Sequence, residues 1–141
     1  MQPTPENKLV SGITLLAVPT IMYGGLVLLG LLTQGTAGPF PEGLGLDDEQ
    51  WALWRAGHAH AGVWVILSLV MQLFLDAARL PKGLTWLARI GAPLAAVLFS
   101  GGFFGLAFVA GFRWLLYLGA LLLAVSLVLT AVGLLRNLRS A

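Results

Sequence analysis

The chain has 141 residues, of which 58% are hydrophobic and only 10% are charged, and its formal net charge is +2. Soluble domains carry roughly 25% charged residues, so this composition excludes a water-soluble globular protein and indicates an integral membrane protein. The chain has no cysteine, which excludes disulfides, thiolate metal sites and thiol catalysis. The basic residues are scattered, so we interpret them as topology determinants and expect no nucleic-acid partner.

Four apolar segments are long enough to cross a bilayer as helices, which takes about 20 residues each. They cover about residues 9–32, 50–75, 84–110 and 114–135. Membrane-spanning segments must satisfy their own backbone hydrogen bonds, and four long segments are too few for a β-barrel. The sequence therefore predicts a single all-α domain, an integral membrane four-helix bundle with up-down topology.

The connections between these segments carry turn and capping residues. The first connection, residues 34–50, is rich in glycine and proline, and its charged residues are all acidic. Either Asp47 or Asp48 is predicted to cap the second helix, because a carboxylate there accepts hydrogen bonds from free backbone amides. Residues 81–83, Pro-Lys-Gly, predict a tight turn before the third helix.

Small residues recur at every fourth position of the third apolar segment. This row comprises Ala88, Ala92, Ala96 and Ser100, and a GxxxG motif follows from Gly101 to Gly105. Such rows let helix backbones approach closely in lipid, so we expect this helix to pack tightly against its neighbours.

Lysine and arginine are distributed unequally between the two sets of helix ends. One set carries six basic residues: Lys8, Arg79, Lys82, Arg89, Arg136 and Arg139. The other set has Arg113, together with Arg55 just inside the second segment. Because basic residues concentrate on the cytoplasmic side, both the N- and C-termini are predicted to be cytoplasmic. We expect a multi-pass protein of a bacterial-type inner (cytoplasmic) membrane.

The second segment contains both histidines, in the stretch Arg55-Ala-Gly-His58-Ala-His60-Ala-Gly62. Its strongly polar residues Arg55, His58, Gln72 and Asp76 lie on one helical stripe, which runs in steps of three and four residues through Gly62, Val65 and Leu69. Lipid penalises exposed polar groups, so the stripe is predicted to face the bundle interior or a water-filled crevice.

The two histidines are two residues apart, which places them about 200° apart around a helix. They cannot both bind one metal ion from an undistorted helix. His58 shares a face with Arg55, and His60 shares a face with Trp64. For His58, heme or metal ligation, a hydrogen bond between helices, and proton handling are all compatible with the pattern. Ligation is also an alternative for His60.

Asp76 and Arg79 lie three residues apart at the end of the second segment. A surface ion pair is one interpretation of this spacing. A proton path through Asp76 is the other, with Gln72 one helical turn before it as the next polar group.

The histidine stretch, extended to Trp64, is similar to the second helix of heme–copper oxidase and nitric oxide reductase catalytic subunits. It resembles more closely the small bacterial four-helix membrane proteins described as oxidase subunit I-like. Residues 91–105, which begin Gly-Ala-Pro, resemble the third helix of those proteins. The resemblance implies that His58 is an axial heme ligand. It also implies that Arg55 pairs with a heme propionate, and that His60 completes the site or contacts a partner.

The chain departs from the large catalytic subunits because it has no histidine outside the second segment. One chain therefore cannot build a dinuclear oxygen-reducing site and is not expected to be a complete enzyme alone. A heme would need a second ligand, such as Met22, Met71 or a histidine of another protomer.

The predicted function is that of a heme-associated or accessory subunit-like protein of a respiratory oxidase or reductase. It would be embedded in the lipid bilayer as a homo-oligomer or as part of a larger respiratory complex. Two alternatives stay open. One is a purely structural or assembly subunit, and the other is a small proton or metal-ion carrier that uses Asp76, Gln72 and His58.

Overall fold

The computed structural model describes residues 3–39 and 44–138, and this part of the chain is helical with no strand. Its helices are α1 (Pro5–Leu32), α2 (Asp48–Leu75), α3 (Lys82–Leu106), the short 3-10 helix η1 (Ala110–Phe112) and α4 (Arg113–Leu138). The four long helices predicted from the sequence are confirmed. Each is long and apolar enough to cross a membrane, so the chain has the length and composition of a multi-pass membrane protein.

The first two helices begin at local caps. The Thr4 side chain accepts a hydrogen bond from the Asn7 amide, and Pro5 occupies the first turn of α1. Asp47 is confirmed as the cap of α2, where it forms a capping box with Gln50. The Gln50 side chain also donates to the Ala107 carbonyl at 2.8 Å, which ties the start of α2 to the end of α3.

The third helix is shorter than the sequence predicts. It ends at Leu106 and not at residue 110, because the amides of Phe108 and Val109 both donate to the Gly105 carbonyl. A Cβ on Gly105 would lie 1.9 Å from the Phe112 ring. Gly105 therefore packs against the connection to α4, while a Cβ on Gly101 would meet nothing. The hydropathy of residues 107–110 gave no indication of this tight turn.

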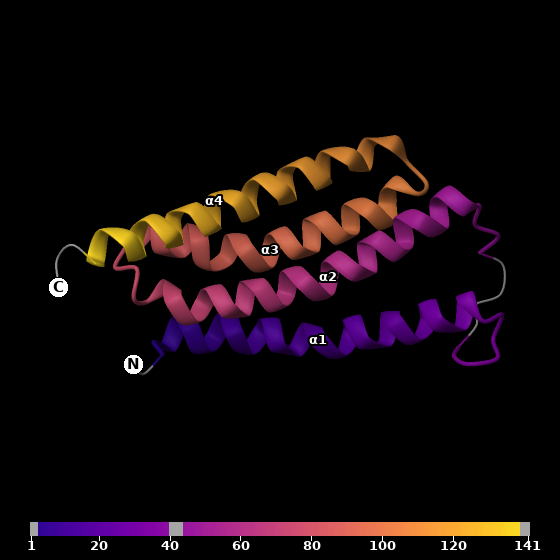
Figure 1. Cartoon of the computed structure of the whole chain (residues 1–141), viewed down its shortest axis with the longest axis horizontal. Helices are drawn as coiled ribbons and strands as arrows, with labels where there is room; N and C mark the ends of the chain where they lie inside the picture. Colours follow the sequence, from indigo (N-terminus) through magenta and orange to yellow (C-terminus); the bar gives the residue numbers. More distant parts are fainter. Residues whose placement is uncertain (1–2, 40–43, 139–141) are drawn as a thin grey trace.

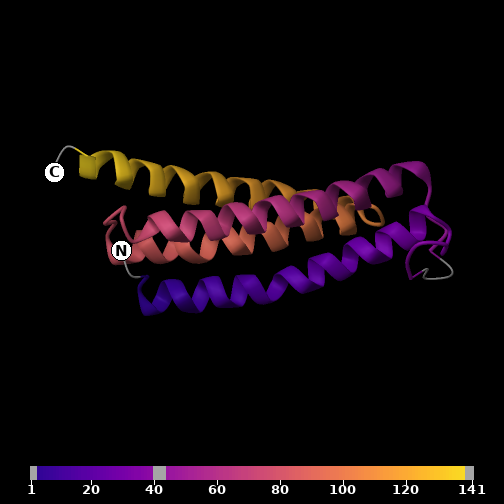
Figure 2. The ribbon, with the colours of Figure 1, turned by 60° about the horizontal axis from the view of Figure 1, so that its bottom comes forward.

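Successive long helices run in opposite directions, and α1 begins at the end of the molecule where α4 ends (Figure 1). Figures 1 and 2 place α1 and α4 on opposite sides of the α2–α3 pair. Within the described residues α1 packs mainly on α2, and it makes no contact with α4. The helices therefore form a row rather than a closed ring.

Small residues bring α3 close to α4. All four members of the predicted small-residue row are buried, as are Ala95 and Gly91. A Cβ on Gly91 would lie 2.5 Å from the Ser126 hydroxyl, and one on Gly119 would lie 2.9 Å from the Phe99 amide. Met71, Ala92, Ala95 and Leu123 form the apolar core beside this contact.

The outermost helix, α1, is packed much less tightly. Only four of its 28 residues are buried: Asn7, Thr14, Gly30 and Leu31. At its C-terminal end the following loop folds back on the helix, and a Cβ on Gly30 would lie 1.9 Å from the Pro39 carbonyl oxygen. The helix is thus held at both ends, and its middle lies beside grooves.

Candidate functional site

His58 lies on the side of α2 that faces α1, against the glycine pair Gly24-Gly25. A Cβ on Gly24 would lie 3.8 Å from Nδ1 of His58, and one on Gly25 would lie 3.0 Å from Nε2. Glycine at position 25 gives the ring its space, whereas a side chain at position 24 would make an ordinary van der Waals contact. No residue in the described part of the chain forms a hydrogen bond with this ring.

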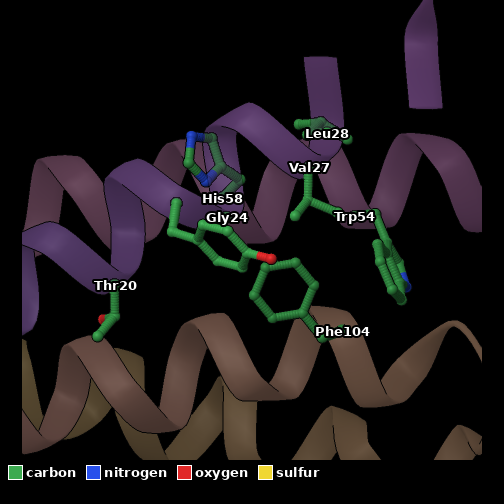
Figure 3. A pocket seen from close by; sticks show the side chains of 8 residues that line it. Thr20, Gly24, Val27, Leu28, Trp54, His58 and Phe104 are labelled. Atoms are coloured by element: carbon green, nitrogen blue, oxygen red, sulfur yellow. The ribbon is translucent and has the colours of Figure 1, made fainter. Parts of the chain in front are cut away.

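Two grooves meet at His58. The first has a volume of about 340 Å³, and its walls include Tyr23, Gly24, Trp54, His58 and Phe104. In Figure 3, His58 and Trp54 of α2 lie toward opposite ends of this groove, and Phe104 of α3 lies between them. Three of the walls are thus aromatic side chains from three different helices.

The second groove has a volume of about 460 Å³, and Met22, Gly25, His58 and Gly62 contribute to its walls. Gly25, the glycine nearest Nε2, lines this groove, whereas Gly24, the one nearest Nδ1, lines the first. The imidazole therefore presents one nitrogen toward each groove. A neutral imidazole has one donor and one acceptor nitrogen, so it offers one of each to an occupant.

His60 occupies the opposite side of α2. Its Nδ1 donates to the Ala56 carbonyl at 2.7 Å, which places the proton on Nδ1 because a carbonyl only accepts. Its ring lies 5.1 Å from the rings of both Phe99 and Phe103 and 6.1 Å from that of Trp64. His60 is thus part of an aromatic cluster with α3.

The two imidazoles consequently face different helices, as their spacing predicts. They cannot share one metal ion within this chain. Among residues 3–39 and 44–138, no three His, Cys, Asp or Glu side chains gather as a metal site. Metal binding by His58 or His60 stays a prediction that would need ligands from elsewhere.

The structure also places the other residues implied by the heme resemblance. Arg55 is exposed, so the stripe predicted to face inward does not do so along its whole length. Met71 is 3% exposed and lies in the apolar core beside Ala92 and Ala95, away from the grooves. Met22 is the methionine that shares a groove with His58.

An iron porphyrin does not fit His58 in this arrangement. A metal–imidazole bond is about 2 Å long, and the flat macrocycle around the metal needs open space beside the nitrogen. Gly25 already lies against Nε2, so a porphyrin there would overlap α1. A heme on His58 would require α1 to move aside.

A second group of polar residues lies at the end where α1 begins and α2 ends. We call it the polar cluster, and it consists of Thr4, Asn7, Gln72, Asp76 and Arg89. Asp76 accepts hydrogen bonds from the Thr4 amide at 3.2 Å, from Asn7 at 3.0 Å and from Arg89 at 2.5 Å. The predicted ion pair between Asp76 and Arg79 is wrong. Asp76 pairs instead with Arg89 of α3, while Arg79 is exposed at a positive φ of 48°.

The carboxylate of Asp76 is stabilised in its charged form. Burial raises its pKa, but hydrogen bonds from Asn7, Arg89 and the Thr4 amide, together with the charge of Arg89, outweigh burial and hold the pKa below 3.8. Asp76 is therefore ionised at neutral pH. It connects the first turn of α1 to α3.

Gln72 belongs to the same cluster. Its side-chain amide donates to the backbone carbonyl of Arg89 at 2.7 Å, and its backbone carbonyl accepts from the Asn7 side chain at 2.7 Å. Its Oε1 is buried and has no hydrogen-bond partner within the described chain. Sequence reasoning missed Thr4 and Asn7, because both precede the first apolar segment at residues 9–32 and α1 begins earlier, at Pro5.

The four long helices have the length and composition of a multi-pass membrane protein, and His58 has no hydrogen-bond partner within the described residues. No protein-family model, no curated protein and no solved structure matches the chain. The function must therefore be inferred from the chemistry of the site.

Proposed function

We propose that this chain is an accessory membrane subunit of a respiratory oxidase or reductase, and that the surface around His58 is its working site. One observation carries the proposal: the His58 ring lies in an apolar groove and has no hydrogen-bond partner among residues 3–39 and 44–138. An unpaired polar group in an apolar environment is costly, and ionisable residues within membrane spans mark functional sites by default. In the proposal the partner group of His58 belongs to another molecule.

The depth of His58 agrees with this role. The residue lies ten positions after the start of α2 at Asp48, or about 15 Å along a helix that rises 1.5 Å per residue. Its contacts are consequently made inside the bilayer. A soluble partner cannot reach this depth, whereas a membrane subunit or a lipid-soluble molecule can.

The proposed orientation has both termini in the cytoplasm of a bacterial-type cell. The basic residues at the end shared by both termini support it. Arg89 is buried and paired with Asp76, so we leave it out of the count of basic residues that set the orientation. Without Arg89, five basic residues at that end still outnumber Arg55 and Arg113 at the other.

The respiratory partner is inferred from the likeness of the Arg55–Trp64 stretch to helix two of heme–copper oxidases. The same likeness implies heme contacts for His58, His60 and Arg55, and these contacts stay predictions; of the three residues, the proposal assigns the partner contact to His58. In the proposal the heme belongs to the partner enzyme, because α1 covers Nε2 of His58. An absorption spectrum of the purified chain tests the other possibility, that the heme is bound by this chain itself.

The experiment is a mild-detergent purification of the tagged chain from its native membrane. We expect a heme-bearing oxidase or reductase to co-purify, detected by its Soret absorbance and by mass spectrometry. The variant His58→Ala should recover less of that enzyme. The matched control is His60→Phe, which keeps a ring in the aromatic cluster and should recover as much enzyme as the wild type. Recovery of the chain without any heme enzyme would contradict the proposal.

A further inference from the structure

The first groove has the features of a small-molecule site. Ligand pockets have volumes of about 300–1,000 Å³, with mostly apolar and aromatic walls and a few placed polar groups. This groove has a volume of about 340 Å³ and is lined by the rings of Tyr23, Trp54 and Phe104. Its polar groups include the His58 imidazole and the Tyr23 hydroxyl, neither of which hydrogen-bonds to another described residue.

The shape and position of the walls restrict the occupant. The aromatic rings come from three helices, which favours a flat ring that can stack or meet them edge-on. Tyr23, which lines this groove, is 63% exposed on α1, so the rim of the groove faces the acyl chains. The occupant must therefore reach the site through the bilayer.

The polar groups specify what the ring of the occupant must carry. His58 presents Nδ1 on the side of the first groove, and Tyr23 supplies a hydroxyl donor. Both groups can donate to carbonyl oxygens. The second groove, of about 460 Å³, is separated from the first by the contact between His58 and Gly25, so a tail would leave the first groove over its exposed rim at Tyr23.

From this geometry we infer that the groove between α1 and α2 binds a lipid-soluble quinone, whose ring lies between Tyr23, Trp54 and Phe104 and accepts a hydrogen bond from His58. The tail leaves over the exposed rim at Tyr23 toward lipid. This inference rests on the proposed location in a respiratory membrane and names the molecule that meets the unpaired imidazole. It assigns binding only, and no electron transfer by this chain.

The test uses the purified full chain in lipid nanodiscs, titrated with decylubiquinone. Quinones quench tryptophan fluorescence, and Trp54 lies in the wall of the site. We expect saturable quenching in the wild type. Binding should weaken roughly tenfold in His58→Ala, which removes one hydrogen-bonding group, and several-fold in Tyr23→Phe. Decylbenzene, which has no carbonyl oxygen, should compete poorly.

A matched pair of glycine variants tests the location. Gly24→Leu places a side chain in the groove and should abolish saturable quenching, whereas Gly12→Leu, on the same helix with open space around it, should bind as the wild type does. Tyr23→Phe removes one oxygen from an exposed side chain and so keeps the test valid if His58→Ala fails to fold. Unsaturable quenching in the wild type, equal binding by Gly24→Leu, or equal competition by decylbenzene would overturn the inference.

The outcome is separable from that of the proposed function. A chain that binds no quinone but still co-purifies with a heme enzyme overturns this inference alone. A chain that binds quinone and recovers no heme enzyme overturns the accessory role alone.

Discussion

Arg89 of α3 reaches Asp76 at the end of α2 and forms an ion pair with it, although the two residues are on different helices and Arg89 is only 2% exposed. The same guanidinium donates to the Thr4 hydroxyl at 3.2 Å. Three helices are thereby joined at one point, where α1 has few other buried contacts. The stability of α1 on the rest of the molecule should depend on this pair.

The first prediction concerns Arg89→Met. Removing Arg89 leaves Asp76, whose side chain is 17% exposed, without its counter-charge and with one hydrogen bond fewer, and a hydrogen bond to a charged group contributes about 1.5–3 kcal/mol. The free energy of unfolding in mixed micelles should fall by about that amount. Arg79→Asn is the control, because Arg79 is exposed and its positive φ suits asparagine. An equal loss in the control would contradict the role given to Arg89.

The second prediction concerns the pH dependence of stability. The pKa of Asp76 is lower in the folded chain than its ordinary value of 3.8. The ionised Asp76 carboxylate therefore stabilises the folded chain fully above pH 3.8, and this contribution to the free energy of unfolding is lost as the pH falls through the folded-state pKa. Unfolding free energies of the wild type and Asp76→Asn should differ by a constant amount at neutral pH and converge in acid. A difference that persists unchanged in acid would contradict this assignment.

The third prediction compares two glycines given the same substitution. Gly119→Ala would place a methyl group 2.9 Å from the Phe99 amide of α3, and overpacking of this kind costs about 1–3 kcal/mol. Gly101→Ala meets nothing and should stabilise the helix by about 0.5–1 kcal/mol. Thermal unfolding followed by circular dichroism measures both. Equal effects at the two positions would show that the α3–α4 contact is not as close as described.

The four helices were predictable because long apolar runs have no alternative in a bilayer, and Asp47 was predictable because its capping box is local in sequence. The row-like arrangement was not predictable, since hydropathy says nothing about which helices touch. The pairing of Asp76 with Arg89 was missed for a related reason. Arg79 is closer in sequence, but the chain turns after Asp76 and brings α3 alongside.

The opposite directions of His58 and His60 followed directly from helical periodicity. That His58 would face a glycine pair of α1 was not visible, because it depends on the register between two helices. Gly24 and Gly25 stood out in the sequence only as adjacent glycines in an apolar segment. Their role becomes evident once the imidazole is seen against them.

The most direct test of the central claim is nitrogen NMR of the chain labelled with ¹⁵N-histidine in nanodiscs, because the chain contains only two histidines. Decylubiquinone should shift the ring-nitrogen resonances of His58 and leave those of His60, whose Nδ1 is held by the Ala56 carbonyl, unchanged. The spectrum of the His58→Ala variant, which lacks the His58 resonances, shows which resonances belong to each histidine. Resonances of His58 that stay in place at saturating quinone, or a shift confined to His60, would contradict the account.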